Sequence, residues 1–503
     1  MKKISIIFLM MIAFLSACDD VLDKKPYTSM PEEDVFMSAE GAQVALEGIY
    51  NALTGEDYYG RLIYAFEASK GPDFWVEDTG NRFERENAYR ESSTSGGYAG
   101  DAWDKIYDVI FACNSLLEGI KSIQGEEAEV TRIRGEATAI RALAYFDLMR
   151  LFAYPPIFSV PGGEHYAEKY KMGVPLLLTK QEHLDALINP PGREDASVCY
   201  DQIVADFDAA ILDLQESDIM RGKISYEAAN ALLGRVHLYL GEWDKAIEAC
   251  TKAKDAGDMI AYGIYTSTYF KPFNNENIWE LGYSETDHLG SNSLNSLVRN
   301  PTVDIPGHPD DGDVLDDGIG YAGYGGSKSL QAILNAVPSD LRSYLICDNE
   351  TGRKRGIRKY IGVNGAHNVH NIPIVRLPEV LLTLAEAEAE SNSDLSMAAG
   401  YLNEVYKART DSEYELPATK EQLIEDILLE RRKELVLEGH TFWDYFRRAI
   451  PFEREEEGNV NSEVAEIDYT QPQVVYPIPQ NEMEANKNIR GQQNPGYDPY
   501  TDQ

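Results

Sequence analysis

Aromatic and polar side chains with the chemistry of a binding site gather first in residues 55–100, a stretch that has no helical periodicity. Trp75 lies there between a Gly-Pro-Asp turn and an Asp-Thr-Gly turn, next to Asp73, Asn81 and Arg82. A flat ring packs well on the apolar C–H face of a sugar and loses little conformational entropy when it is fixed. The neighbouring carboxylate, amide and guanidinium groups can bond sugar hydroxyls, so these four residues are predicted to bind a ligand.

A second irregular stretch, residues 260–370, carries Tyr283, Tyr321 and Tyr324 among many Gly, Asn, Asp and Pro residues. A stretch this long without regular structure is usually functional in a compact protein. The three tyrosines are therefore predicted to share the ligand site. The alternative for any one of these rings is packing against its own loop. Trp103, Trp243, Trp279 and Trp443 have regular context instead, and we expect them in the core.

Five aspartates crowd into residues 310–317 of the second stretch. Asp310, Asp311 and Asp313 supply enough oxygen ligands for a hard cation such as calcium, although their spacing is not that of an EF-hand. A solvated acidic loop is the alternative. The sequence thus predicts no cofactor, with structural calcium as the single metal candidate.

The sequence shows no catalytic motif. It has neither HExxH nor GxSxG, and none of its eight histidines marks the base of a nucleophile. Residues 318–323 spell GxGxxG, but the preceding DDGDVLDD is not the buried strand that a dinucleotide loop requires. We expect a protein that is not an enzyme. A glycoside hydrolase stays open as an alternative, because a pair of carboxylates cannot be recognised among 84 acidic residues.

The charge and cysteine content narrow the class of partner. The 503 residues include 84 acidic and 46 basic side chains, a net charge of −38, which argues against nucleic acid as a partner. Cys113, Cys199, Cys250 and Cys347 are scattered without metal-like spacing. Cys113 and Cys250 fall on apolar helix faces, which favours buried free thiols over disulfides.

Helices must position these loops. In residues 372–448, apolar residues recur at helical spacing in successive segments separated by a Ser-Asn-Ser-Asp break, which predicts an antiparallel hairpin followed by further helices. We expect one of these helices to end near Gly439. Arg431 and Glu434 are spaced to pair on its surface, as are Glu430 and Lys433. Residues 226–257 carry the small and apolar positions of a tetratricopeptide repeat. The predicted fold is mostly α, with stacked repeat hairpins as a scaffold and long loop-rich segments that carry the ligand site.

The start of the chain reads as a lipoprotein leader. Lys2 and Lys3 precede an apolar run, residues 4–15, that is too short to span a bilayer. Small residues then lead to Cys18, as in a bacterial lipobox. The sequence predicts a signal peptide at residues 1–17, lipidation of Cys18, and a polar tether over residues 18–33.

Five blocks of the sequence resemble the SusD/RagB family of outer-membrane lipoproteins of Bacteroidetes. The first block is IRGEATAIRALAYFDLMRLFAYPPI, in which Ala153 and Tyr154 replace the usual glycine before the proline. The others are NIPIVRLPEVLLTLAEA, YLNEVYKAR, ERRKELVLEGHTFWDYFRR and YPIPQNEMEANKNIRGQQNPGY. Acidic residues directly after Cys18 also resemble the surface-export signal of such lipoproteins.

The resemblance implies a surface-exposed lipoprotein of the outer membrane that captures oligosaccharide and passes it to a SusC-like TonB-dependent transporter. Residues 34–259 correspond to the N-terminal part with helical repeats, and residues 260–503 to the C-terminal part, the two forming one integrated domain. A peptide-capturing, RagB-like protein is the alternative within the family. The identity of the glycan does not follow from the resemblance.

Overall fold

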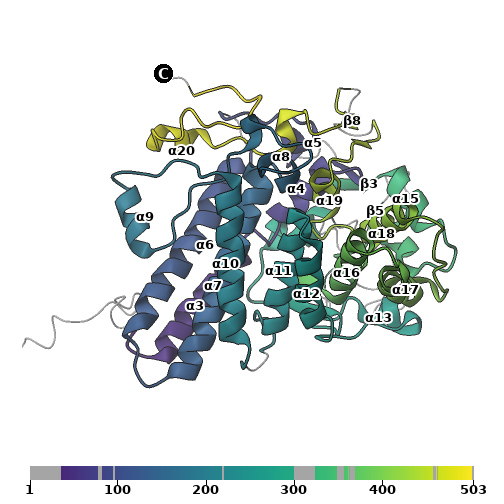
Figure 1. Ribbon diagram of the computed structural model, residues 1–503, viewed down its shortest axis with the longest axis horizontal. Helices are drawn as coiled ribbons and strands as arrows, with labels where there is room; N and C mark the ends of the chain where they lie inside the picture. Colours follow the sequence, from purple (N-terminus) through teal and green to yellow (C-terminus); the bar gives the residue numbers. More distant parts are fainter. Residues whose placement is uncertain are drawn as a thin grey trace, which may run out of the picture.

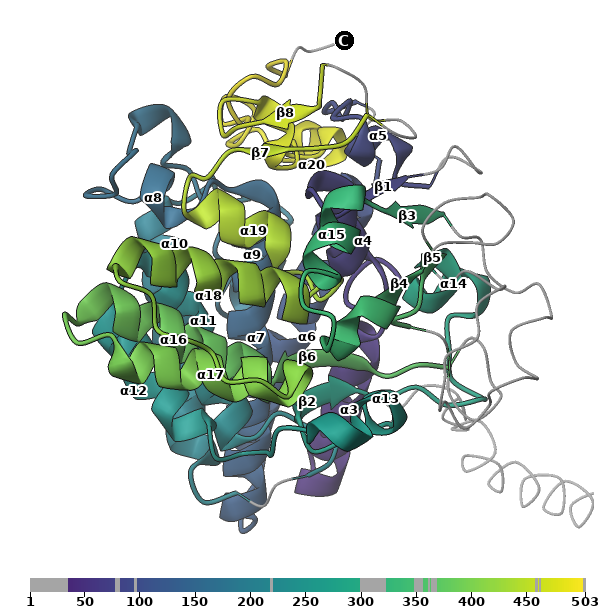
Figure 2. The same cartoon turned by 90° about the vertical axis from the view of Figure 1, so that its right-hand side faces the viewer.

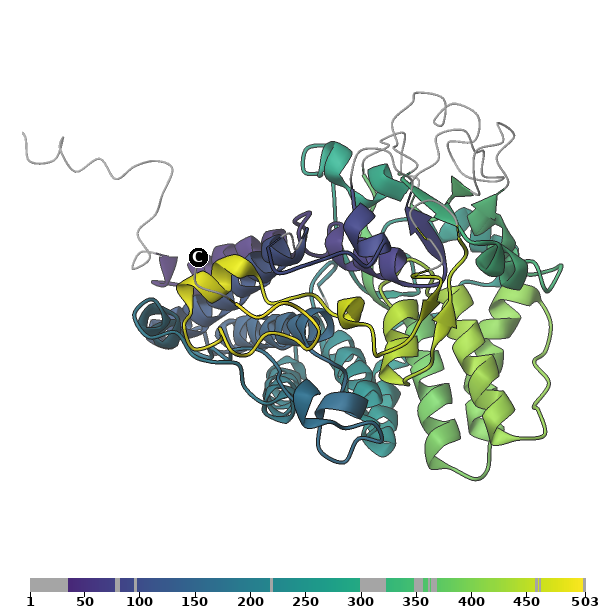
Figure 3. The same cartoon turned by 90° about the horizontal axis from the view of Figure 1, so that it is seen from above.

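The helices carry most of the fold, as the sequence predicts. The structure is a computed structural model that describes residues 35–76, 82–94, 97–217, 220–298, 323–347, 356–360, 362, 369–456, 460 and 463–500. Within these residues the long helices before residue 153 lie on the left of Figure 1 and the helices between residues 377 and 434 lie on the right, while the C-terminal segment returns to the upper left. The same progression is seen from above in Figure 3.

Four helices form the N-terminal layer and pack side by side. They are α3 (Ala39–Leu53), α6 (Ala99–Gly119), α7 (Glu127–Phe152) and α10 (Ala196–Leu214). Helix α7 is buried around most of its circumference, because α3, α6 and α10 all contact it. It ends just before Pro155, since a residue that precedes proline is biased away from helical backbone angles.

The predicted tetratricopeptide hairpin is present as α11 (Tyr226–Leu240) and α12 (Trp243–Ala253). The two helices approach closely at Gly234, where a Cβ atom would lie 2.3 Å from Sγ of Cys250. Gly241 ends α11 in the left-handed region, with φ of +69°, which glycine adopts at little cost. The small residues of the repeat are therefore required by this packing.

The C-terminal layer confirms the predicted hairpin and the helices after it: α16 (Leu377–Ser391), α17 (Ser396–Thr410), α18 (Lys420–Glu434) and α19 (Thr441–Arg447). Helix α16 packs on α12, so both hairpins belong to one continuous stack. The prediction that a helix ends near Gly439 is wrong by one turn. The backbone leaves the helix after Glu434, and Leu437 already has φ of +57°.

Short strands tie distant parts of the chain together in antiparallel pairs, β1 with β3, β2 with β6, β4 with β5 and β7 with β8. Their bounds are Phe74–Val76 (β1), Asn277–Leu281 (β2), Tyr324–Gly326 (β3), Ile346–Cys347 (β4), Gly356–Ile357 (β5), Ile372–Arg376 (β6), Phe452–Glu453 (β7) and Glu466–Ile467 (β8). Shorter helices fill the connections, namely α4 (Leu62–Lys70), α5 (Glu84–Asn87), α8 (Pro156–Ser159), α9 (Lys180–Ala186), α13 (Tyr265–Thr268), α14 (Leu294–Val298), α15 (Lys328–Leu334) and α20 (Gln480–Ala485).

A buried ionic cluster joins the C-terminal helices to the strands. The carboxylate of Glu434 accepts hydrogen bonds from Arg342, Arg376 and Arg409 at 3.1, 2.9 and 3.0 Å. Burial alone would raise the pKa of Glu434, but the three guanidinium groups outweigh it and hold this pKa well below its usual range. The predicted Arg431–Glu434 pair is thus wrong, because Glu434 turns into the cluster while Arg431 bonds Asp444 on α19.

Two smaller predictions about single residues are confirmed. Lys433 pairs with Glu430 one turn earlier on α18, with 2.5 Å between the charged atoms. Cys113, Cys199 and Cys250 are free and buried.

Among the described residues, no helix is both long and apolar enough to cross a lipid bilayer.

Candidate functional site

The two irregular stretches meet on one side of the helical scaffold. Strand β1 from the first stretch pairs with β3 from the second, with Trp75 opposite Gly325. Figure 2 shows β1, β3 and α14 together on the right of the molecule, away from α11 and α12. The sequence assigned both stretches to one site, and the structure brings their described parts into direct contact.

The side chain of Trp75 is buried inside this contact between β1 and β3. Only 2% of its surface is exposed, and its indole packs so close to Gly325 that a Cβ atom there would lie 2.2 Å from Cζ2 of the ring. A ring with so little exposed surface has no free face for a ligand. The expectation that Trp75 presents an exposed platform is therefore wrong, because strand pairing across 250 residues of sequence turns the ring inward.

Tyr324 and Asp73 are also engaged inside the protein. The Tyr324 ring is 2% exposed, its hydroxyl lies 2.7 Å from Oγ of Ser69, and it donates to the carbonyl oxygen of Ala65 at 3.1 Å. Asp73 is 1% exposed and accepts a hydrogen bond from Nε of Arg432 at 2.6 Å. The structure corrects both predictions of exposure, and it assigns these side chains to the join between loops and scaffold.

Nearer the surface, Arg82 connects the two stretches and Tyr283 connects the second stretch to the end of α3. The guanidinium of Arg82 donates to the carbonyl oxygen of Ser291 at 2.9 Å and to Oδ1 of Asn292 at 3.4 Å. The hydroxyl of Tyr283 donates to the carbonyl oxygen of Thr54 at 2.7 Å, and burial raises its pKa. Both side chains are partly exposed, so they can contribute to a surface site as well as hold it together.

A stacked aromatic pair that the sequence analysis did not single out lies at the same junction. The rings of Tyr98 and Phe83 stack with 4.0 Å between centroids and an interplanar angle of 16°. Phe83 is fully buried, whereas Tyr98 is partly exposed, and the guanidinium carbon of Arg61 lies 5.4 Å from the Tyr98 centroid. Arg61 is itself neutralised by Glu56 at 3.2 Å. The pair offers a rigid ring without net charge.

The backbone around this pair is held firmly. Phe83 adopts φ of +56°, which is uncommon for a residue with a side chain and persists only where its surroundings enforce it. The buried carboxylate of Glu86 accepts from the N–H of Tyr98 at 3.3 Å. Burial raises the pKa of Glu86, while the nearby Lys70 ammonium lowers it. A fixed ring binds a flat ligand at a low entropic cost.

Several predicted site residues lie outside the residues that the structure describes. They are Cys18, Asn81, Tyr321 and the calcium candidates Asp310, Asp311 and Asp313. Within the described residues, no group of three or more His, Cys, Asp or Glu side chains is placed to hold a metal ion. These assignments remain predictions from the sequence.

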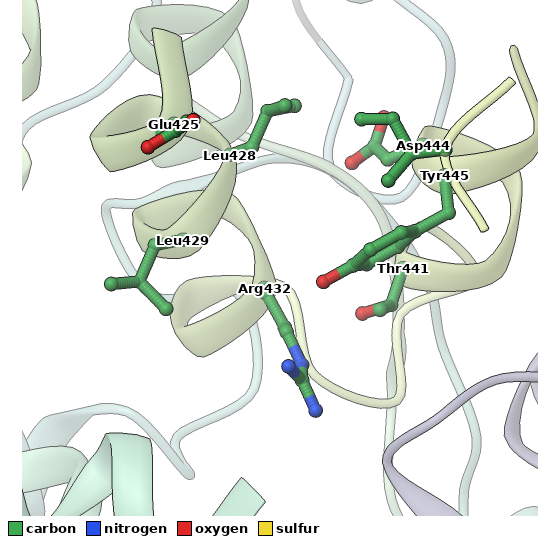
Figure 4. Close-up of a pocket in the computed structure, with 8 residues that line it drawn as sticks. Glu425, Leu428, Leu429, Arg432, Thr441, Asp444 and Tyr445 are labelled. Carbon is green, nitrogen blue, oxygen red and sulfur yellow. The ribbon is translucent and has the colours of Figure 1, made fainter. Parts of the chain in front are cut away.

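A pocket of about 230 Å³ lies behind the junction, between α18 and α19. Figure 4 shows Leu428 of α18 facing Tyr445 of α19, with Arg432 below them. Arg432 bonds Asp73, so this pocket reaches the chain just before β1. Its wall also contains the buried hydroxyl of Thr441, which has no hydrogen-bond partner within the part of the chain that the structure describes. The pocket is small and mostly apolar, and it lies beside the loop-built face.

Three of the four tryptophans expected in the core are there. Trp103, Trp279 and Trp443 are 3% exposed or less. Trp243 is partly exposed, because the first residue of α12 lies at the tight turn after α11 and its ring extends over a surface cleft. The prediction that Trp243 lies in the core is therefore wrong.

The structure is that of a helical-repeat protein with a face built from irregular segments. Comparison with known proteins agrees. Residues 20–238 match the family described as "Starch-binding associating with outer membrane", and residues 346–497 match the SusD family. The chain belongs to the SusD/RagB family.

Relatives match over nearly the whole chain. A SusD-like protein of Formosa agariphila is 27% identical, across 89% of this chain and 91% of the relative. The crystal structure of a SusD superfamily protein from Bacteroides thetaiotaomicron is 29% identical, with a TM-score of 0.79, and the match covers 91% of this chain and 100% of the other. A laminarin-binding SusD-like protein is 21% identical with a TM-score of 0.66, over 91% and 99% of the two chains, and shares the fold.

Proposed function

We propose that this protein is a surface lipoprotein that binds a neutral oligosaccharide at the Tyr98 face and delivers it to a SusC-like TonB-dependent transporter. The Tyr98 face exposes parts of Arg82, Tyr98 and Tyr283, and the buried side chains of Phe83 and Arg61 lie against the Tyr98 ring. The observation that carries the proposal is the partly exposed Tyr98 ring, stacked at 4.0 Å on buried Phe83 where both irregular stretches meet. Family membership and the outer-membrane description of the matching family model support it.

The chemistry of the face favours a sugar without charge. The Tyr98 ring offers an apolar surface for a pyranose C–H face, and Arg82 offers N–H donors for hydroxyl groups. Arg61 is balanced by Glu56 at 3.2 Å and by Asp57 at 3.7 Å, so little net positive charge is left there for an anionic ligand. The net charge of −38 disfavours polyanions further.

Binding and turnover are separated by one titration series. Purified protein is titrated calorimetrically with malto-, laminari- and xylo-oligosaccharides and with mixed peptides, and each mixture is then analysed for new reducing ends. Saturable oligosaccharide binding without new reducing ends is the expected result. Release of reducing ends would identify a glycoside hydrolase, and binding of peptides alone would identify a peptide-capturing protein.

Delivery from the membrane surface is tested in cells. A Cys18→Ala variant lacks the predicted lipid attachment site and is expected in the soluble fraction, whereas the native chain is expected in the outer membrane. Uptake of the oligosaccharide that binds in vitro should fall in cells that carry only Cys18→Ala. Equal uptake by both strains would overturn the delivery step without touching the binding site.

A further inference from the structure

A cleft of about 570 Å³ opens on the side of the scaffold opposite the Tyr98 face. It lies between the turn after α8, the tight turn from α11 to α12, and the C-terminal ends of α16 and α19. Figure 2 shows α8, α11 and α12 on the left and the strands of the loop-built face on the right. We call it the Trp243 cleft. Its lining includes Val160, Gly162, Trp243, Glu390, Arg447 and Arg448.

Trp243 supplies an aromatic surface to this cleft. It is the first residue of α12, and its ring borders Gly241, where a Cβ atom would lie 3.7 Å from Cζ2 of the indole. The ring is partly exposed, whereas the other tryptophans of the chain are buried. A partly exposed tryptophan in a concave surface offers a flat apolar ring face on which a sugar can pack.

Fixed polar groups line the opposite side of the cleft. Arg447 bonds both carboxylate oxygens of Glu386, at 2.7 and 2.6 Å. Arg448 bridges Glu386 at 2.8 Å and Glu390 at 2.7 Å. The side chains of Arg448 and Glu390 are 19% and 17% exposed, so their outer edges face the cleft. Planar guanidinium groups held this way present donors in a constant geometry.

The charges in this network balance each other. The guanidinium groups of Arg447 and Arg448 face the carboxylates of Glu386 and Glu390. A third cation, the ammonium group of Lys420, lies 3.1 Å from Glu390, and a third carboxylate, that of Asp444, accepts from Nε of Arg447 at 2.8 Å. Burial alone would raise the pKa of Glu386, but Arg447 and Arg448 outweigh it and lower this pKa to about 2. Glu386 therefore stays ionised at any physiological pH, and the cleft presents paired donors and acceptors without a strong field. Such a surface suits a neutral polyhydroxylated ligand better than an ion.

We propose that the Trp243 cleft is a second saccharide-binding site that takes one or two neutral pyranose residues. The volume falls in the range of about 300–1,000 Å³ that small-molecule sites usually have. One ring face packs on Trp243, and hydroxyl groups bond the exposed edges of Arg448 and Glu390. This site does not depend on the Tyr98 face, because the two lie on opposite sides of the scaffold and share no residue.

The distribution of tryptophans provides a direct test. All five tryptophans are among the described residues, and the four besides Trp243 are 3% exposed or less. Acrylamide quenching of intrinsic fluorescence therefore reports mainly on Trp243. Maltose, cellobiose, laminaribiose and xylobiose are titrated up to 50 mM, and the Stern–Volmer constant is measured at each concentration.

The proposal expects at least one disaccharide to lower the Stern–Volmer constant at least twofold, and to do so saturably. The effect should disappear in Val160→Phe, because this substitution narrows the cleft while Trp243 is kept. It should also disappear in Trp243→Phe, because this variant lacks the fluorophore that acrylamide quenches. It should persist in Tyr98→Ala, which alters only the opposite face. Tyr401→Ala removes a partly exposed tyrosine from α17 and is the matched control for Tyr98→Ala.

Two results would overturn the second site. In the first, no disaccharide protects Trp243, whether or not calorimetry detects binding at the Tyr98 face. In the second, protection occurs but survives Val160→Phe and is lost in Tyr98→Ala, which would trace it to the other face. If only the proposal about the Tyr98 face is wrong, calorimetry detects oligosaccharide binding whose affinity is the same in Tyr98→Ala as in the native protein. The two proposals can therefore be refuted independently.

Discussion

The packing between the two irregular stretches predicts how much a substitution at Gly325 should destabilise the protein. This glycine lies opposite Trp75 in the β1–β3 pair, and a Cβ atom there would lie 2.2 Å from Cζ2 and 2.4 Å from Cε2 of the indole. The backbone of Gly325 is outside the left-handed region, so alanine meets no conformational strain. The steric conflict with Trp75 is therefore the dominant effect of Gly325→Ala.

The expected cost follows from how little the indole can move. Trp75 is 2% exposed and packed in the main core, so relief requires the ring to shift or the strands to separate. Overpacking of this kind costs about 1–3 kcal/mol. Gly48→Ala in α3 is the matched control, because its Cβ meets nothing within 4 Å. That substitution should stabilise the protein by about 0.5–1 kcal/mol, since alanine favours helix over glycine.

Urea unfolding followed by circular dichroism measures both variants, with m-values compared to confirm a shared transition. The double variant Gly325→Ala with Trp75→Phe removes the clashing atoms, so its loss should be smaller than the sum of the two single losses by at least about 0.5 kcal/mol. A Gly325→Ala protein as stable as Gly48→Ala, or a strictly additive double variant, would refute the packing described here.

Three further predictions address the buried cluster, the pH dependence and the ligand. Glu434→Gln should cost about 3–5 kcal/mol in urea unfolding, because it leaves buried guanidinium groups without a counter-charge, whereas Glu415→Gln on an exposed loop should change nothing measurable. Burial raises the pKa of Glu91 to about 7, against the opposing effect of Lys70. Between about pH 4.5 and 7 the Glu91 carboxyl is therefore protonated in the folded protein and ionised in the unfolded chain. The free energy of unfolding should fall as pH rises through this window, and it should fall less in Glu91→Gln. An identical pH slope in both proteins would contradict this. Tyr98→Ala should weaken oligosaccharide binding about 5–30-fold through the loss of one stacked ring, and Tyr401→Ala should leave it unchanged; equal affinities in both variants would remove Tyr98 from the site.

The helical scaffold was predictable because its signals are local. Apolar spacing fixed both hairpins, and small residues such as Gly234 and Gly241 marked where helices approach and end. The end of α18 was missed because Glu434 and the residues after it are held by arginines from distant elements, which no local pattern reveals.

The candidate site was predictable only in outline. Turn-rich composition located the two irregular stretches, and the structure places them together. The composition could not show which rings face solvent, because Trp75 and Tyr324 are turned inward by a pairing of only three residues per strand. Tyr98 carried one weak signal, its place directly after a Ser-Gly loop and before a helix. Trp243 was assigned to the core because helical periodicity does not reveal that its helix begins directly after a tight turn at the surface.

The structure of the protein with a bound oligosaccharide tests the central claim most directly. The account predicts a sugar ring stacked on Tyr98, with hydroxyl groups within hydrogen-bond distance of Arg82 and both irregular stretches in contact with the ligand. An oligosaccharide that binds with saturable affinity but leaves Tyr98 uncovered would contradict it.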